Sequence, residues 1–266
     1  MGKKLIGAKF VSKQENHKMS FAYSFCSLVT DQKLYDSFVN SAKAAGFGSD
    51  CEFLSVDNTS MTQTDAYSGL NSMIERSQGN ILILCHQDIL FDFDNRIILE
   101  DRLKKLEQKD TKWGVCGVAG FPRNEKYQFV RITDKFGDNQ MVGNFPTQVI
   151  CLDECFLIIK RKSGVRLSAD IFGFHLYGTD ICLIAEILGY KAYVIDFHLR
   201  HLGNGLIGPS YHKAYNSFRQ KWSYTLRDRY IRSTALPIFL TGRQEPYFLR
   251  NLRSWIARKI QKYQIR

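Results

Sequence analysis

The chain has 266 residues, 44% of them hydrophobic and 13% aromatic, which fits one large globular domain and excludes a disordered protein. No apolar run is long enough to cross a bilayer, and the first residues lack the apolar core of a signal peptide, so we expect a cytoplasmic protein. The seven cysteines form no CxxC pair, which predicts buried reduced thiols and argues against a disulfide framework or a zinc site.

The net charge of +11 is concentrated at the carboxyl end. Residues 200–266 hold 14 Lys and Arg against two acidic residues, whereas the first 199 residues hold 23 against 24. This asymmetry indicates a dedicated surface for an anionic lipid or a nucleic acid. Because the body is neutral and no stacking-aromatic motif or helix-turn-helix is present, we expect no nucleic-acid partner.

The first half of the chain alternates predicted strands with predicted helices. Apolar and aromatic runs predict strands at 21–29, 51–56, 80–85 and 113–121, and one-sided apolar periodicity predicts helices at 31–45, 65–77 and 96–108. Such alternation is typical of βαβ units with parallel strands and right-handed crossovers. The predicted fold class is therefore α/β.

The pattern changes after residue 121. The polar segment 122–146 predicts irregular or hairpin structure over a site, followed by strands at 148–152, 155–160 and 191–195 and helices at 179–188 and 210–232. The last of these helices is basic throughout. We therefore divide the chain into a catalytic domain, 1–209, and a basic helical extension, 210–266.

Asp88 ends the run His86-Gln87-Asp88 that follows the apolar strand expected at 80–85. Ligands of open α/β sheets bind at the carboxyl ends of strands. A carboxylate at that position is a candidate ligand for a divalent cation that carries a diphosphate. A solvated Asp in a turn at the strand end explains the same residue without a ligand.

Two further carboxylates lie at element ends. Asp57 ends the second strand, where it can accept hydrogen bonds from a ribose or a base, or cap the following turn. Asp180 begins a predicted helix, where it can act as a general base near a sugar acceptor or simply stabilise the first helical turn.

These motifs carry a family resemblance. The block Gly69–Phe91 resembles the nucleotide-sugar-binding half of family 2-type glycosyltransferases, in which a helical Asn, a Gly, an apolar strand and an Asp-x-Asp element follow in this order. With Gly114–Gly120 and Phe174–Gly205, the chain is similar to the glycosyltransferase-like family typified by the streptomycin-biosynthesis StrF domain. The resemblance covers about Ser20–Gly205. It implies a GT-A fold, an αβα sandwich with a mostly parallel central sheet, here followed by the basic helical extension.

The resemblance also implies roles for single residues. Asp88 becomes the metal-binding carboxylate and Asp180 the base that deprotonates the acceptor hydroxyl. The implied donor site comprises Asp57, Asn58, Asn71, His86 and Gln87.

His86 departs from the family pattern, because it occupies the place of the first carboxylate in Asp-x-Asp. Imidazole ligates Mn²⁺ but suits Mg²⁺ poorly, so a metal site that includes His86 favours Mn²⁺. Contact of His86 with the nucleotide, or a metal-independent enzyme, remains open. His201 resembles a late metal or phosphate ligand of GT-A enzymes, and a loop histidine bonded to a backbone carbonyl is the alternative.

The segment Pro246–Arg266 predicts an amphipathic helix with Trp255 on its apolar face and basic residues around it. This pattern is typical of helices that lie on an anionic membrane surface. A terminal helix docked on the domain is the alternative.

The resemblance implies an enzyme, a hexosyltransferase-type glycosyltransferase that uses a nucleotide sugar, UDP-linked, and a divalent cation. We expect inversion at the anomeric carbon and a saccharide or lipid-linked acceptor in cell-surface polysaccharide synthesis. The expected location is peripheral, at the inner face of the membrane. The alternative is a non-catalytic GT-A-like module that binds a nucleotide or a membrane, because His86 replaces a carboxylate.

Overall fold

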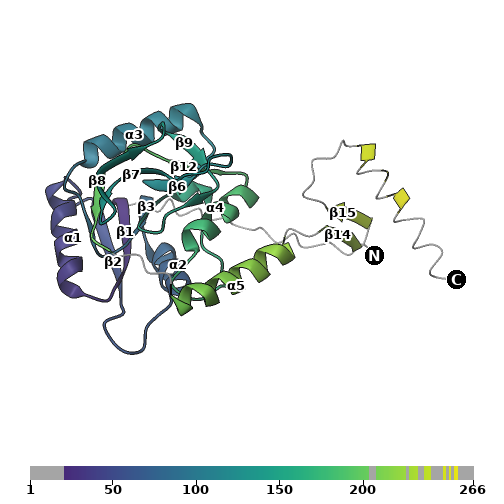
Figure 1. Cartoon of the computed structure of the whole chain (residues 1–266), viewed down its shortest axis with the longest axis horizontal. Coiled ribbons are helices and arrows are strands. Elements are labelled where there is room, and N and C mark those ends of the chain that lie inside the picture. Colours follow the sequence, from purple (N-terminus) through teal and green to yellow (C-terminus); the bar gives the residue numbers. More distant parts are fainter. Residues whose placement is uncertain are drawn as a thin grey trace, which may run out of the picture.

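Figure 1 shows the computed structural model of the chain. It describes residues 21–203, 208–225, 228–232 and 237–240, together with Phe248, Leu249, Leu252, Trp255 and Ile256. Within these ranges, none of the helices combines the length and the hydrophobicity that a membrane span requires.

A seven-stranded sheet forms the centre of the body, with strand order β2-β1-β3-β11-β5-β12-β9. Five strands point the same way, and β11 and β9 run antiparallel to their neighbours. The strands are β1 (Phe21–Val29), β2 (Cys51–Asp57), β3 (Gly79–Cys85), β5 (Trp113–Gly117), β9 (Thr147–Val149), β11 (Phe156–Lys160) and β12 (Lys191–Val194). The α/β class and the mostly parallel central sheet are confirmed.

Helices cover both faces of this sheet, which makes an αβα sandwich (Figure 1). They are α1 (Gln32–Ala44), α2 (Ala66–Arg76), α3 (Arg96–Lys109), α4 (Tyr177–Ile187) and α5 (Pro209–Thr225), with a 3-10 turn at Arg161–Ser163. Side chains of Asp31, Asp65 and Asn95 accept backbone N–H groups at the starts of α1, α2 and α3.

The apolar runs of the strands follow from this layering. In β3, Ile83 packs into the core beneath α1 and α3, whereas Leu82 and Leu84 pack into the core with α2 and α4. Because successive side chains of a strand point to opposite faces, a strand between two helical layers is apolar throughout.

A second sheet lies beside the first, with order β10-β6-β7-β13-β4 and with β8 paired to β7. Its strands are β4 (Ile89–Leu90), β6 (Ala119–Phe121), β7 (Phe129–Asp134), β8 (Gly137–Val142), β10 (Cys151–Leu152) and β13 (Leu199–His201). The polar segment 122–146 therefore contains the expected hairpin, β7–β8.

Two expected strands are each divided between the sheets. The run 113–121 forms β5 in the first sheet and β6 in the second, and 148–152 forms β9 and β10 in the same way. Both parts of 113–121 are buried up to Gly120, so the sequence shows one continuous apolar run where the chain changes sheets. All seven cysteines are free, and all except Cys151 are buried, as expected.

The helix expected at 210–232 is too long. Helix α5 ends at Thr225, and residues Arg229–Arg232 form β14, which pairs antiparallel with β15 (Pro237–Leu240). Ala214 and Trp222 of α5 are buried, so the first part of the expected extension packs on the body. Most of the segment Pro246–Arg266 lies outside the described residues.

Candidate functional site

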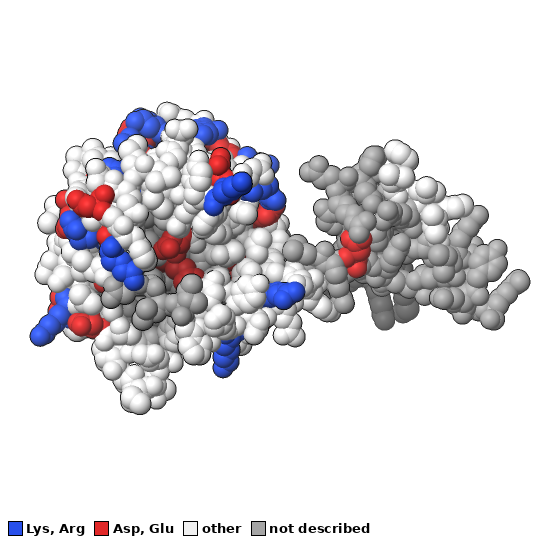
Figure 2. Space-filling view, viewed as in Figure 1, with Lys and Arg blue, Asp and Glu red and all other residues white. Residues whose placement is uncertain are grey.

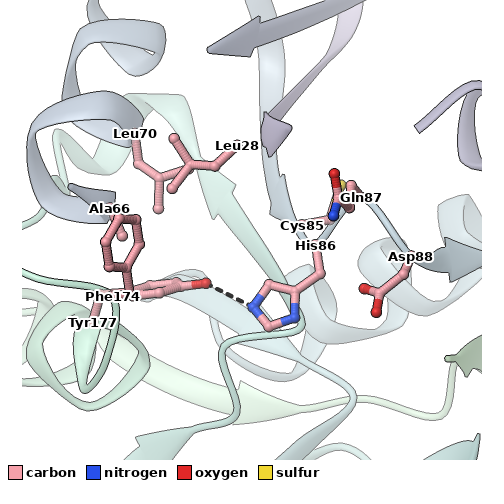
Figure 3. Close-up of a pocket in the computed structure, with 9 residues that line it drawn as sticks. All are labelled: Leu28, Ala66, Leu70, Cys85, His86, Gln87, Asp88, Phe174 and Tyr177. Atoms are coloured by element: carbon pink, nitrogen blue, oxygen red, sulfur yellow. Dashed lines mark hydrogen bonds between the residues drawn. The ribbon is translucent and has the colours of Figure 1, made fainter. Parts of the chain in front are cut away.

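A pocket of about 280 Å³ lies at the carboxyl end of β3, where His86, Gln87 and Asp88 leave the central sheet (Figure 3). Its apolar side comes from the end of β1, from α2 and from the start of α4. The lining residues are Leu28, Ala66, Leu70, Cys85, His86, Gln87, Asp88, Phe174 and Tyr177. This is the strand-end position at which α/β sheets bind ligands.

His201 reaches the pocket edge through the second sheet. Strand β13 pairs antiparallel with β4, so that His201 lies opposite Ile89, and the Leu202 amide donates to the Asp88 carbonyl at 3.1 Å. The two histidines, 115 residues apart in sequence, then lie with Nδ1 of His86 3.2 Å from Nε2 of His201.

His86, Asp88 and His201 form a potential metal-binding group. One ligand atom from each lies within 4.8 Å of the others, and Nε2 of His201 is 3.4 Å from a carboxylate oxygen of Asp88. Gly203 adjoins the group. A Cβ at that position would lie 2.6 Å from Nε2 of His201 and 2.9 Å from Oδ2 of Asp88, so any larger residue would require these ligand atoms to shift.

The three residues differ in their electrostatics. Burial opposes ionisation of Asp88, but the hydrogen bond and charge of His201 outweigh it and lower the Asp88 pKa. Burial opposes protonation of His201, yet the hydrogen bond and charge of Asp88 raise the His201 pKa. Burial and the neighbouring His201 lower the pKa of His86, which keeps that ring neutral. A neutral His86 has a lone pair available for a cation.

The surroundings of the group are acidic. Asp153 acts electrostatically on both histidines, and Asp134 acts on His201. Figure 2 shows acidic side chains in a hollow of the body, with Lys and Arg nearer the margins of that face. None of the nine residues that line the pocket is Lys or Arg. Among the described residues, the positive charge at this part of the site is limited to what protonation of a histidine provides.

Three of the residues expected to bind the sugar nucleotide have side-chain amides that form hydrogen bonds within the protein. Both amide atoms of Asn58 bond to the backbone of Thr64, and both amide atoms of Asn71 bond to the backbone of Leu167. Gln87 lines the pocket, and its amide oxygen accepts the backbone N–H groups of Thr30 and Asp31. These contacts hold the loops around the site.

Asp57 lies exposed at the end of β2, as expected. Its Oδ1 accepts the backbone N–H and the hydroxyl of Thr59, which lowers the Asp57 pKa. Asp57 is not among the residues that line the pocket.

Asp180 is not among the residues that line the pocket. Its side chain is fully buried, and its oxygens accept the backbone N–H and hydroxyl of Ser168 and the indole N–H of Trp222. Burial raises the Asp180 pKa. A base must reach the acceptor hydroxyl, whereas in this structure the Asp180 oxygens contact Ser168 and Trp222, so the expected role of Asp180 as base stays a prediction.

Sequence reasoning missed Tyr177 and Gly203. The Tyr177 hydroxyl lies 3.0 Å from Nε2 of His86. Tyr177 lies three residues before Asp180, and Gly203 lies two residues after His201. No periodicity or spacing connects either residue to His86, because the end of β13 and the start of α4 come close to His86 only in the tertiary structure.

No protein-family model matches the sequence. A protein of Fuscovulum blasticum named ATP synthase subunits region ORF 6 is 39% identical over 235 residues, which cover 86% of this chain and 94% of that protein. The chain belongs to the same family as ATP synthase subunits region ORF 6. The name of this ORF 6 relative states no reaction and no ligand.

Solved structures show which fold this chain has. A mannosyltransferase from Pyrobaculum calidifontis, in complex with GDP-Man and Mn²⁺, matches 78% of the chain with a TM-score of 0.51 at 13% identity. TarS of S. aureus matches 78% with a TM-score of 0.52 at 9% identity. The chain spans 65% of the mannosyltransferase and 40% of TarS. The fold is that of GT-A glycosyltransferases, as the sequence resemblance implied; the narrower StrF-like resemblance stays a prediction.

Proposed function

We propose that this protein is a glycosyltransferase that moves a sugar from a nucleotide-sugar donor to a saccharide or lipid-linked saccharide. The observation that carries the proposal is the group of His86, Asp88 and His201 at the edge of a pocket at the end of β3. In a fold shared with glycosyltransferases, this is a polar site with room for a ligand and with potential ligands for a cation.

The residues present fit a divalent cation. Two imidazoles and one carboxylate favour Mn²⁺ over Mg²⁺, and Gly203 leaves the ligand atoms accessible. When bound, such a cation neutralises charge on the leaving nucleoside diphosphate. Because none of the described residues that line the pocket is Lys or Arg, a cation held by His86, Asp88 and His201 would supply positive charge for an anionic donor.

The donor that we propose is a UDP-linked hexose, on the strength of the sequence resemblance. The apolar wall of Leu28, Ala66 and Leu70 gives the nucleoside a surface to pack on. Asp57 remains the proposed ribose or base contact. Because the solved mannosyltransferase holds GDP-Man, guanine donors belong in the same screen.

The acceptor proton needs a base, and two carboxylates are candidates. Asp180, the base proposed from the sequence, would require movement of Ser168 and Trp222 before it met a substrate. Asp153 is exposed and acts on both histidines of the site, so it requires no such movement. We therefore propose Asp153 as the base and keep Asp180 as the alternative, with inversion at the anomeric carbon.

The proposed place of work is the inner face of a membrane, on an acceptor of cell-surface polysaccharide synthesis. Support comes from the basic carboxyl-terminal quarter and from four exposed apolar residues at helical spacing near its end. These are Phe248, Leu252, Trp255 and Ile256. The boundary between a catalytic domain and an extension at residue 209 is part of this proposal.

Donor turnover tests the proposal. Full-length protein is incubated with a panel of UDP- and GDP-sugars, with Mn²⁺, with Mg²⁺ or with EDTA, and release of nucleoside diphosphate is measured. Mn²⁺-dependent release that Asp88→Asn removes supports a transferase. Binding of a nucleotide without release, in the presence of acceptor saccharides, favours the alternative of a non-catalytic module.

A further inference from the structure

Tyr177, the first residue of α4, has its hydroxyl between a proposed metal ligand and a backbone carbonyl. The hydroxyl oxygen lies 3.0 Å from Nε2 of His86 and 3.2 Å from the carbonyl oxygen of Glu154. The Tyr177 side chain is buried, so water does not compete for these contacts. Figure 3 shows the hydroxyl at one nitrogen of the His86 ring and Asp88 on the other side of that ring.

The directions of these two hydrogen bonds follow from the proton count. A tyrosine hydroxyl has one proton to donate, and a backbone carbonyl can only accept. If both contacts are hydrogen bonds, Tyr177 donates to the Glu154 carbonyl and accepts from Nε2–H of His86. The neutral ring then has its proton on Nε2 and its lone pair on Nδ1.

The lone pair points to the site. Nδ1 of His86 lies 3.2 Å from Nε2 of His201, the same nitrogen that lies 3.4 Å from Asp88. Of the two ring nitrogens of His86, Nδ1 is thus the one that faces the other two residues of the group. The opposite tautomer would put a proton on Nδ1 and block it.

We infer that Tyr177 is a positioning residue for cation binding, because it fixes the tautomer and the ring orientation of His86. The inference rests on the proposed function, which requires the cation. Outer hydrogen-bond partners of metal-ligating histidines commonly account for about 10- to 100-fold in metal affinity. Loss of the Tyr177 hydroxyl should reduce affinity by that order.

The chain offers a matched control. Tyr67 is also buried, packs edge-on against Tyr177 with ring centroids 6.3 Å apart, and donates its hydroxyl to the His175 carbonyl at 3.1 Å. Tyr67→Phe and Tyr177→Phe each remove one buried hydroxyl that donates to a backbone carbonyl. Only Tyr177→Phe also removes the hydrogen-bond partner of Nε2 of His86.

The experiment has two measurements on the full-length protein. The first is Mn²⁺ affinity by EPR detection of the free ion, for wild type and both variants. The second is the tautomer of His86 in metal-free protein, from long-range ¹H–¹⁵N spectra of ¹⁵N-histidine protein. The His86 signals are assigned by their absence in His86→Gln.

We expect about 10- to 100-fold weaker Mn²⁺ binding in Tyr177→Phe and near-wild-type binding in Tyr67→Phe. We also expect an Nε2–H tautomer in wild type that Tyr177→Phe no longer enforces. Equal affinity of Tyr177→Phe and wild type, or equal weakening in both variants, overturns the inference.

The tautomer separates this inference from the proposed function. A wild-type protein without Mn²⁺ binding contradicts the proposed metal site. In that case Nε2 protonation of His86 in wild type still supports the contact with Tyr177, and Nδ1 protonation overturns it. The wild-type spectrum also decides the question if Tyr177→Phe does not fold.

Discussion

Trp222 donates its indole N–H to Oδ1 of Asp180 at 3.0 Å, although 42 residues separate them in sequence. The contact ties α5 to α4, and the other carboxylate oxygen accepts the Ser168 amide at 2.8 Å. Both side chains are buried, so water cannot replace either partner. In this structure, a carboxylate that is expected to act in catalysis connects α5 with α4 and with the backbone at Ser168.

This contact gives the first prediction, for Asp180→Asn. The NH₂ group of the new Asn side chain would face another donor, either the Ser168 N–H or the Trp222 N–H. A buried donor without a partner costs about 1–3 kcal/mol. We expect a lower free energy of unfolding, measured by urea titration, and turnover within a few fold of wild type at a temperature well below unfolding.

Asp153→Asn serves as the counterpart, because general-base catalysis contributes about 10²–10⁴-fold in rate. It should lose turnover in that range with little change in unfolding. Wild-type stability together with a rate loss of that size in Asp180→Asn would restore Asp180 as the base.

The second prediction concerns Asp88. Asp88→Asn removes the one carboxylate among the three proposed ligands and should weaken Mn²⁺ binding by more than about 10-fold, because a neutral amide oxygen is a poorer ligand. Isothermal titration with Mn²⁺ measures this. Asp92→Asn, which removes a half-exposed carboxylate paired with Arg200, is the control and should bind as wild type does.

The third prediction concerns Gly203. In Gly203→Ala the added methyl would lie 2.6 Å from Nε2 of His201 and 2.9 Å from Oδ2 of Asp88, so the ligand atoms must move apart. We expect loss of Mn²⁺ binding with a cooperative unfolding transition retained. Gly208→Ala meets no atom within 4 Å and controls for the loss of a glycine near this loop. Unchanged metal binding by Gly203→Ala would mean that the cation does not bind here.

The fourth prediction is a pH dependence of stability from Glu154. Burial and the charge of Asp153 raise the Glu154 pKa from 4.5 to about 8, although backbone N–H groups at the start of α4 oppose the shift. The unfolded chain therefore releases this proton near pH 4.5 while the folded protein keeps it to about pH 8. The contribution of Glu154 to the free energy of unfolding must fall across that window and level off above it.

Glu154→Gln removes the pH dependence that Glu154 gives to the free energy of unfolding. The variant should gain stability relative to wild type as the pH rises from 5 to 8, in urea titrations at each pH. Glu75→Gln, at an exposed position on α2, controls for the loss of one negative charge. A stability difference between Glu154→Gln and wild type that does not change with pH would contradict the assignment.

The fifth prediction concerns the carboxyl-terminal segment. Trp255 and Ile256 are 45% and 41% exposed, so replacing both by Ser should weaken sedimentation with anionic vesicles. Binding should also fall as salt rises, since surface charges are screened over about 10 Å at 0.1 M salt. Phe136→Ser, at a 76% exposed position in the β7–β8 turn, is the control. Equal vesicle binding by all three proteins would favour a docked terminal helix.

Sequence pattern alone was sufficient for the layered part of the fold. Strands β1, β2, β3 and β11 and helices α1 to α4 lie within a few residues of their expected ranges, because an apolar run between two helical layers and a one-sided helix each have a distinct periodicity. The strand-end position of Asp88 followed from the same pattern. The pattern did not predict that the chain passes from the first sheet to the second after Gly117, because both parts of the run 113–121 are buried up to Gly120.

Which residues come together in the site could be determined only from the tertiary structure. A residue's type and its place at an element end made Asp88, His86 and His201 candidates, but only the pairing of β13 with β4 brings His201 to Asp88. The same local criteria selected Asp180, whose burial under Trp222 depends on the path of α5. Local sequence fixes which side chains stand at the ends of strands and helices. Which of them share a solvent-accessible pocket depends on packing between elements far apart in the chain, and that packing leaves no periodic signal in the sequence.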